Sequence, residues 1–175
     1  MEFTLTVNAG GDDVNEDGSS FVTNGSTLWL GTGEDPQKSF TGLRFTQVPL
    51  PKGAKVLKAK LEVVDTEGQW MPLDLQVAGE ASPDCKGFKK PDPPSKRWLT
   101  EAVVQHSSDE PWEQGEYTVV ADVSAVVEEV VGMSGWSPGH ALCLVVKGNG
   151  SAFGRKFVAS FEGGQAPRLL VRIAE

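Results

Sequence analysis

The sequence has few of the residues on which most catalytic and transition-metal sites depend. Its 175 residues include only two histidines and two cysteines. His106 lies in the polar segment QHSSDEP, and no second histidine or cysteine stands at the spacing of a zinc site, so we expect it to be a surface residue. Long apolar runs are also missing, which argues against membrane insertion. These absences favour a non-catalytic globular domain over an enzyme.

Basic residues are outnumbered by acidic ones. Lysine and arginine number 16 against 24 acidic residues, which gives a net charge of -8. A charge of this sign repels nucleic acids and anionic membrane surfaces, so neither is expected as a partner. A local exception is the basic group Lys86, Lys89 and Lys90 in residues 81–96, a segment with four prolines that we expect to be a loop.

Glycine and proline are plentiful, with 20 and 11 copies, and they divide the chain into short segments. Ten of these segments carry the composition of short strands, and one of them, AKVLKAKLEVVD, alternates imperfectly between a buried and a solvated face. In that segment Leu61 and Val63 alternate with Lys60 and Glu62. We therefore predict a single all-β domain over residues 1–175, folded as a two-sheet antiparallel sandwich of jelly-roll type.

One segment has the period of a helix instead. In DVSAVVEEVVGM, residues 122–133, the five valines fall on one helical face and the two glutamates fall on the other. Asp122 is a suitable N-cap, and Gly132 can adopt the backbone conformation that ends a helix. The pattern predicts one short amphipathic helix, over about 123–131, added to the sandwich.

The segment after this helix contains Gly-Trp-Ser-Pro-Gly at residues 135–139, which matches the G-x-S-x-G pattern of serine hydrolases. In those enzymes a strand precedes the serine and a helix follows it, and the histidine comes later in the chain. Here the helix precedes the motif, a strand follows it, and the only later histidine is the adjacent His140. We interpret the motif as a turn.

The two cysteines differ in context. Cys85 lies in the proline-rich loop, whereas Cys143 lies among the apolar residues of ALCLVVK, a predicted core strand. Two cysteines alone do not specify a disulfide. We expect Cys143 to be a buried free thiol, and a Cys85–Cys143 bridge is the alternative.

Several phrases together resemble one family. These are TGLRFTQVPLPKGAKVLKAKLEVV, PWEQGEYTVVADVSAVVEEVV, GWSPGHALCLVVKGNG and ASFEGGQAPRLLVRI, in this order. They are similar to bacterial extracellular β-sandwich modules related to the DNRLRE domain and to carbohydrate-binding modules. The resemblance implies a non-catalytic, jelly-roll-like module linked to other domains of a secreted or surface-attached protein. Some relatives bind polysaccharides such as alginate, but the ligands of the family are mostly unassigned, so the resemblance indicates location more than ligand.

The amino-terminal segment adds to the expected location. The chain opens with MEFTLTVN, which has neither the basic start nor the apolar stretch of a signal peptide. Together with the resemblance, this leads us to expect a mature fragment of an extracellular or cell-surface protein.

An acidic segment near the amino terminus resembles half of a calcium loop. Asp13, Asn15 and Asp17, followed by Gly18, match D-x-[DN]-x-[DN]-G, in which alternate oxygens converge on a hard cation. The twelfth position is Asn24 instead of the bidentate glutamate, so a helix-loop-helix hand is excluded. The remaining interpretations are a structural calcium loop and a solvated turn between two strands.

Five tryptophans suggest stacking on sugar rings, because an indole face suits the C–H face of a pyranose. Strand alternation places Trp29 opposite Leu28 and Leu30, on the side predicted to face solvent. Trp70 and Trp98 follow polar residues, so they too are candidates for stacking, although partial burial is the alternative for each. The family resemblance implies instead that two others are structural plugs: Trp112 and Trp136.

We therefore predict a polysaccharide-binding module, with a neutral glycan favoured by the acidic charge. Its binding residues would be Trp29, Trp70 and Trp98, assisted by hydrogen bonds from Arg97 and Gln69. The alternative is a structural or adhesion module that joins other domains, with calcium as a stiffener. An exposed aromatic strip would favour the first, and a strand edge used for pairing would favour the second.

Overall fold

The computed structural model describes residues 1–68 and 71–175, and this part of the chain is mostly β-structure. The strands are β1 (Glu2–Thr6), β2 (Asp13–Asp17), β3 (Ser20–Thr23), β4 (Thr27–Gly31), β5 (Ser39–Phe45), β6 (Val56–Val64), β7 (Leu73–Glu80), β8 (Leu99–Ser108), β9 (Tyr117–Asp122), β10 (Leu142–Gly148), β11 (Arg155–Ala159) and β12 (Arg168–Ile173). The helices are α1 (Ser124–Val131) and a short 3-10 turn, η1 (Pro94–Lys96).

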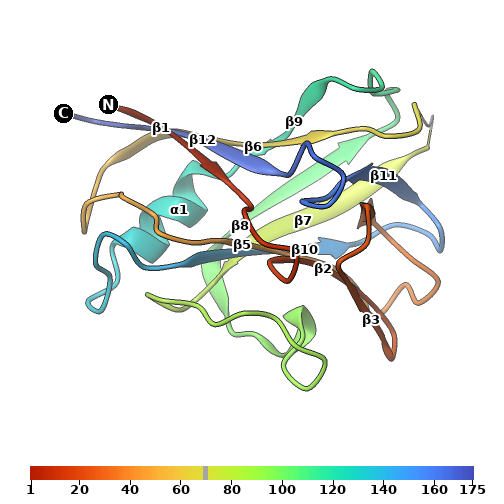
Figure 1. The fold of residues 1–175 in the computed structure, drawn as a ribbon, viewed down its shortest axis with the longest axis horizontal. Helices are drawn as coiled ribbons and strands as arrows, with labels where there is room; N and C mark the ends of the chain where they lie inside the picture. Colours follow the sequence, from red (N-terminus) through yellow and green to blue (C-terminus); the bar gives the residue numbers. More distant parts are fainter. Residues whose placement is uncertain (69–70) are drawn as a thin grey trace.

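The strands form two larger sheets and one small one. One sheet has the order β1-β12-β6-β9 and the other the order β3-β2-β5-β10-β7-β8, while β4 and β11 pair separately. All of these pairings are antiparallel. Figure 1 shows the four-stranded sheet along the upper side of the molecule and the six-stranded sheet below it. The predicted all-β antiparallel sandwich is confirmed, and the small third sheet is an addition.

The hydrophobic core lies between the two larger sheets. Leu61 and Leu169 contribute from the four-stranded sheet, and Leu43, Leu75 and Leu144 contribute from the six-stranded sheet; all five are fully buried. Because alternate residues of a strand point to opposite faces, one apolar face from each sheet is enough to build this layer.

Helix α1 packs against this core, as its apolar face predicts. Val126, Val127, Val130 and Val131 are buried, and the helix contacts β6, β7 and β8. The predicted N-cap is wrong by one position, since Val123 occupies it, although the Asp122 carboxylate still accepts a hydrogen bond from the Ser124 backbone N–H at 3.0 Å. No helix in the described ranges has the length and apolar content needed to cross a bilayer.

Two of the tryptophans fill the interior, as expected. Trp136 is fully buried and donates from its indole N–H to the Leu50 carbonyl oxygen at 2.9 Å. Trp112 is also buried, and the ammonium group of Lys156 lies 4.4 Å from its ring centroid. The Gly-Trp-Ser-Pro-Gly segment around Trp136 forms turns between α1 and β10, in agreement with its interpretation as a turn.

A disulfide joins Cys85 to Cys143, so the expectation of free thiols is wrong. Cys143 alternates with Leu142 and Leu144, which face the main core, and it therefore points to the opposite face of β10. The segment 81–98 covers that face and forms a second apolar cluster there, made by Val14, Cys85, Phe88, Ala141 and Cys143. Alternation within one strand could not reveal that a distant loop covers its outer face.

The two ends of the chain lie side by side (Figure 1). β1 pairs with β12 in antiparallel register, from Glu2 opposite Arg172 to Thr6 opposite Arg168. At the extreme end, the Ile173 backbone N–H donates to the Met1 carbonyl oxygen at 3.0 Å. Both termini therefore lie at the same end of the β1–β12 pair, in which β1 forms an edge of the four-stranded sheet and β12 is the next strand.

Candidate functional site

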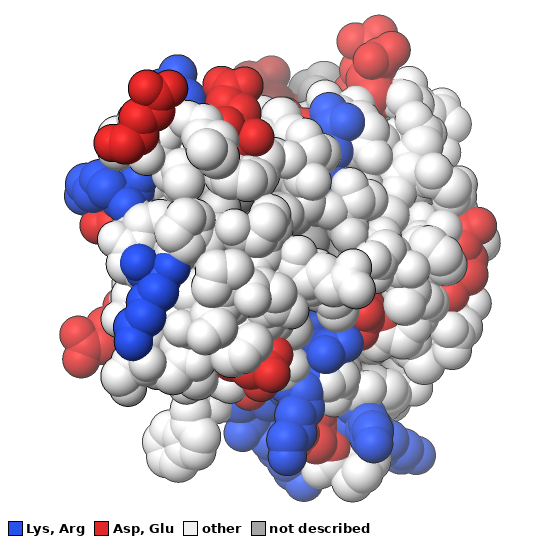
Figure 2. Space-filling view, turned by 60° about the vertical axis from the view of Figure 1, so that its left-hand side comes forward, with Lys and Arg blue, Asp and Glu red and all other residues white. Residues whose placement is uncertain are grey.

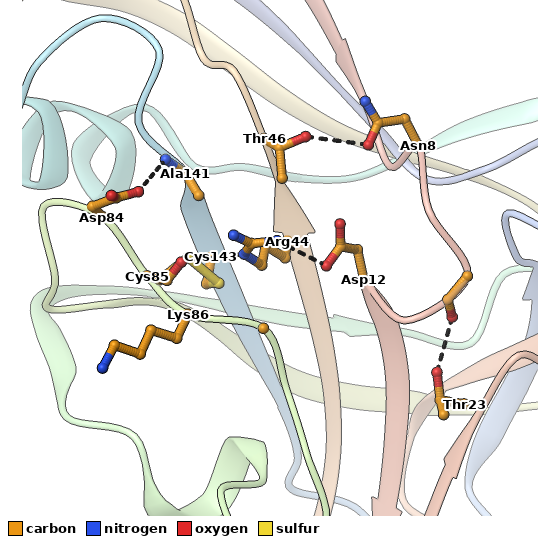
Figure 3. Close-up of polar contacts among 12 residues, drawn as sticks. Asn8, Asp12, Thr23, Arg44, Thr46, Asp84, Cys85, Lys86, Ala141 and Cys143 are labelled. Carbon is orange, nitrogen blue, oxygen red and sulfur yellow. Dashed lines mark hydrogen bonds and ion pairs between the residues drawn. A yellow bond between two sulfur atoms is a disulfide. The ribbon is translucent and has the colours of Figure 1, made fainter.

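The loop 81–98 is the candidate site, and its shape is held from within. The disulfide fixes Cys85 to β10, and the backbone N–H of Ala141 donates to the Asp84 carboxylate at 2.8 Å (Figure 3). Arg44 of β5 donates to the Cys85 carbonyl oxygen at 3.1 Å and forms an ion pair with Asp12 at 3.2 Å. The loop is thus attached to both β5 and β10 at its first half.

Arg97 holds the second half of the loop. Its guanidinium is buried, lies 4.6 Å from the Phe88 ring centroid and pairs with Glu80 at 2.7 Å. It also donates to three backbone carbonyl oxygens at 2.9 to 3.1 Å, those of Lys86, Gly87 and Asp92. These protein acceptors hold the Arg97 guanidinium within the loop, and its predicted hydrogen bond to a glycan stays a prediction.

The Glu80 carboxylate, which pairs with Arg97, also lies close to the sulfur atoms of the Cys85–Cys143 disulfide. Burial raises the pKa of the Glu80 carboxyl, and the hydrogen bond and charge of Arg97 oppose that effect. Among the described residues, the only three Cys, His, Asp or Glu side chains at metal-binding spacing are Glu80, Cys85 and Cys143. Since both sulfur atoms are joined in the disulfide, they have no thiolate to offer a metal.

Trp98 is the exposed aromatic side chain of this loop. With 86% of its surface exposed, it contrasts with its buried neighbour Arg97. It borders a hollow of about 240 Å³ whose other lining residues are polar: Glu80, Ser82, Asp84, Lys86, Asp92, Lys96 and Arg97. A flat apolar ring therefore lies beside hydrogen-bonding groups of both charges. Such a combination can contact both the C–H face and the hydroxyl groups of a sugar ring.

The same loop carries several exposed basic side chains. Lys86, Lys89, Lys90 and Lys96 are all exposed. Figure 2 shows lysine and arginine gathered at the lower end of the molecule, where the loop lies in Figure 1. The local charge at this end therefore differs in sign from the net charge of the chain.

Trp29 does not join this site, and its predicted exposure is wrong. Only 8% of its surface is exposed. β4 pairs with β11 so that Trp29 lies opposite Phe157, and the Arg155 guanidinium lies 5.4 Å from the indole centroid. The Arg155 side chain of this second strand lies over the indole, on the face that alternation assigned to solvent. The other two predicted ligands, Gln69 and Trp70, lie outside the described residues.

The predicted calcium loop is a strand, β2, and its three side chains serve different neighbours. The Asn15 amide donates to the Trp29 carbonyl oxygen at 2.9 Å and accepts from the Trp29 N–H at 3.0 Å. The Asp17 carboxylate accepts from the backbone N–H groups of Glu34 and Asp35, both at 2.8 Å. Their oxygens thus do not converge as in a calcium loop, and calcium binding by this motif stays a prediction.

Asp13, the remaining residue of that motif, is buried, and other negatively charged carboxylates lie near it. Burial is the main cause that raises the pKa of its carboxyl to about 6, and the charges of Glu162 and Asp12 add to it. The hydrogen bond from the Phe161 backbone N–H acts in the opposite direction. This carboxyl therefore titrates well above the usual range of an aspartic acid.

Lys156 is fully buried, although no motif in the sequence marks it as a functional residue. Its ammonium group donates to the Glu110 carbonyl oxygen at 2.5 Å, beside the Trp112 ring, and burial lowers its pKa. The alternation in GRKFVASFE could have suggested an inward side chain at position 156. It could not show that an aromatic ring and a carbonyl oxygen would receive the charge.

Comparisons with known proteins leave the family unassigned. No family model matches the sequence, and a search of curated proteins finds no significant match. The resemblance to DNRLRE-domain and carbohydrate-binding modules therefore stays a hypothesis.

Proposed function

We propose that this domain is a non-catalytic polysaccharide-binding module that stacks a sugar ring on Trp98. The observation that carries the proposal is the 86% exposure of this indole beside a polar hollow. Tryptophan is usually buried to a large extent, so a fully presented indole on a braced loop is unusual for a residue with only a structural role. The hollow beside it supplies hydroxyl-binding groups.

The bracing of the loop supports this proposal. A ligand that binds a mobile loop must first order it, which subtracts from the affinity. Here the disulfide, Arg97 and the Ser95–Glu16 contact, in which the serine hydroxyl donates at 2.6 Å, already hold the segment around Trp98. The indole is thus presented without a large further loss of conformational entropy.

The charge of the site bears on the class of glycan. The net charge of -8 favours a neutral polysaccharide, whereas the lysines of the loop reduce repulsion of an acidic one at this end. We propose a neutral glycan as the principal ligand. An acidic glycan of equal chain length serves as the comparison in the binding test.

The test is calorimetric titration and affinity electrophoresis against neutral and acidic polysaccharides. Trp98→Ala should weaken binding by about 1–3 kcal/mol, the scale of a stacking anchor, and leave the melting temperature unchanged. Phe153→Ala is the matched control, because it removes another exposed aromatic ring, 54% exposed, away from the hollow. Equal binding by wild type and Trp98→Ala, or no retained glycan, would exclude this function.

A structural or adhesion module is the second candidate, and β8 is the observation that favours it. β8 is ten residues long and forms one edge of the six-stranded sheet within the described residues. Leu99 and Val103 on it are exposed, and an open strand edge can pair with another chain. Self-association that increases with protein concentration and is abolished by Val103→Lys would favour this candidate, provided that the domain retains no glycan.

The proposed location is extracellular, within a larger protein. Disulfides persist in oxidising compartments, and the Cys85–Cys143 bridge is in keeping with such a location. Labelling of free thiols in protein taken directly from its native source would test this. Two reactive thiols after unfolding would contradict it.

A further inference from the structure

The Arg155 side chain lies among three aromatic rings on the small sheet. Its guanidinium carbon is 5.0 Å from the Phe157 ring centroid and 5.4 Å from the centroids of Trp29 and Phe153. Trp29 and Phe157 are opposite one another on β4 and β11, and Phe153 lies in the loop before β11. The residues before and after Trp29 belong to the main core, so the indole lies on the opposite face of the sheet. All three rings are within cation–π distance of one cation.

Arg155 is also a partly buried arginine without an acidic partner. Arg44, Arg97 and Arg168 each pair with a carboxylate at 2.7 to 3.2 Å. Within residues 1–68 and 71–175, the Arg155 guanidinium makes no ion pair and donates no hydrogen bond, and the same holds for Arg172, which is exposed to water. None of the Arg155 nitrogens is a buried atom without a partner, so its N–H groups reach solvent. They are therefore free to donate to an anion.

The loop before β11 holds Phe153 in a conformation that aromatic residues seldom adopt. Its φ of 62° lies in the left-handed region, which is unfavourable for a bulky side chain. The backbone is fixed on both sides, because the Phe153 N–H donates to the Gly33 carbonyl oxygen and the Arg155 N–H donates to the Phe153 carbonyl oxygen, both at 2.9 Å. The Phe153 side chain is nevertheless 54% exposed, so burial offsets only part of this strain. A strained backbone that presents an exposed ring beside an unpaired cation points to a ligand.

The chemistry of these residues favours a carboxylate that is joined to a ring. A guanidinium presents its N–H groups in a planar fork, which matches the two oxygens of a carboxylate. Arg155 is the one cation among the four residues, so it balances the single charge of a carboxylate better than the larger charge of a phosphate group. The Phe153 ring, 5.4 Å from the guanidinium, offers a flat apolar surface to the remainder of the ligand. One small acid can therefore contact both groups.

We propose that Arg155 and Phe153 form a binding site for small organic acids in which the carboxylate is attached directly to an apolar or aromatic ring. The carboxylate pairs with the Arg155 guanidinium, and the ring of the ligand stacks on Phe153. Trp29 and Phe157 position the guanidinium through their cation–π contacts, so less side-chain entropy is lost when the acid binds.

This site is independent of the proposed glycan site. It shares no residue with the lining of the hollow beside Trp98. It also takes a different ligand, because the acid is recognised by its charge, whereas a neutral glycan carries none. A variant at Phe153 should therefore leave the binding of a neutral glycan unchanged, and failure of one proposal does not decide the other.

The test is titration of the whole chain with sodium benzoate at constant ionic strength, followed by the indole N–H signals in NMR spectra. The signal of Trp29 is assigned from the variant Trp29→Phe. Benzoate should shift this signal with a Kd of about 1–10 mM, the range for a ligand of its size. Benzamide has the ring without the charge, and acetate has the charge without the ring. Each should bind at least about tenfold more weakly than benzoate.

Three variants separate the contributions of the two residues. Arg155→Gln should weaken benzoate binding by about tenfold or more, and Arg155→Lys, which keeps the charge but loses the planar fork, by about threefold or more. Phe153→Asn removes the ring and should also weaken binding, while asparagine tolerates the left-handed conformation and preserves the fold. Arg172→Gln is the matched control, because it removes an exposed arginine for which no ring contact is found, and it should leave the affinity unchanged.

Two results would overturn the proposal. The first is equal binding of benzoate and benzamide, which would show that the ring alone is recognised. The second is a benzoate affinity that Arg155→Gln and Phe153→Asn leave unchanged, or that Arg172→Gln lowers as much as Arg155→Gln does. In that case benzoate binds elsewhere or responds only to the net charge of the chain.

Discussion

The side-chain amide of Asn15 pairs with the backbone of Trp29 as a neighbouring strand would. Its Nδ2 donates to the Trp29 carbonyl oxygen at 2.9 Å, and its Oδ1 accepts from the Trp29 N–H at 3.0 Å. The Thr41 hydroxyl donates to the same carbonyl oxygen at 2.6 Å. β4 belongs to the small sheet, so this buried pair connects the small sheet to the six-stranded one.

Replacement of Asn15 should therefore be costly. Asn15→Ala leaves the buried N–H of Trp29 without an acceptor, and we expect the free energy of unfolding to fall by about 2–4 kcal/mol. Chemical denaturation measures this loss. Asn149→Ala is the control, because Asn149 is exposed and its change should stay within about 0.5 kcal/mol. Equal stability of the two variants would show that the Asn15 pair is not needed.

Stability should fall as the pH rises from 4 to 6.5. The pKa of Asp13 is raised to about 6 in the folded state, so the folded state holds this proton more tightly than the unfolded state. The resulting stabilisation is complete below about pH 4 and is lost as the pH rises through 6. With allowance for solvent screening, we expect a loss of about 1–2 kcal/mol in chelator.

Asp13→Asn provides the control for this pH dependence. Asp12 and Glu162 face the same carboxylate and also change charge on acidification, so the comparison must be between complete stability curves. The variant should lose the slope between pH 4 and 6.5 and keep the remainder of the curve. An identical slope in wild type and variant would assign the pH dependence to other groups.

Reduction of the disulfide should destabilise the domain. The bridge joins residues 58 positions apart, and a closed loop of this length contributes about 4 kcal/mol in the chain-entropy description. We expect the Cys85→Ala, Cys143→Ala double variant to melt lower by about 8–16 °C. Wild type in strong reductant should reach the same melting temperature. A variant as stable as oxidised wild type would contradict this expectation.

Replacement of Trp136 and of Trp98 by alanine should affect the stability of the domain very differently. Trp136→Ala removes a fully buried indole and leaves its hydrogen-bond acceptor, the Leu50 carbonyl oxygen, without a partner, so we expect a loss of about 3–5 kcal/mol. Trp98→Ala removes an exposed side chain and should change stability by less than about 0.5 kcal/mol. Thermal unfolding of both variants under one condition gives the comparison, and similar losses would contradict the assigned burial.

Local patterns in the sequence predicted the elements well but not the surfaces that cover them. The spacing of valines gave α1 almost to the residue, because the helix buries one stripe against a single core. The same kind of reasoning placed Trp29 in solvent, because alternation describes one strand and takes no account of β11 beside it. Burial of such a face depends on pairing between distant strands.

The site shows the same division between local and distant information. The basic loop and Trp98 were visible in the sequence, since short polar and proline-rich segments lie on the surface. The inward turn of Arg97 was not visible, because its acceptors come from Glu80 and from carbonyl oxygens whose directions only the folded loop fixes. The approach of Arg155 to the Trp29 ring likewise depends on the pairing of β4 with β11.

The adjacent ends of the chain determine how the domain would bear mechanical load. Because β1 and β12 are antiparallel neighbours, a pull on both ends would separate Met1 from Ile173 first. Their hydrogen bonds would then break one at a time, as in a zipper, instead of sharing the force as in shear. We expect single-molecule stretching from residues 1 and 175 to open the domain at low force. Attachment at Glu2 and Arg168, which lie at opposite ends of the β1–β12 pair, should require more.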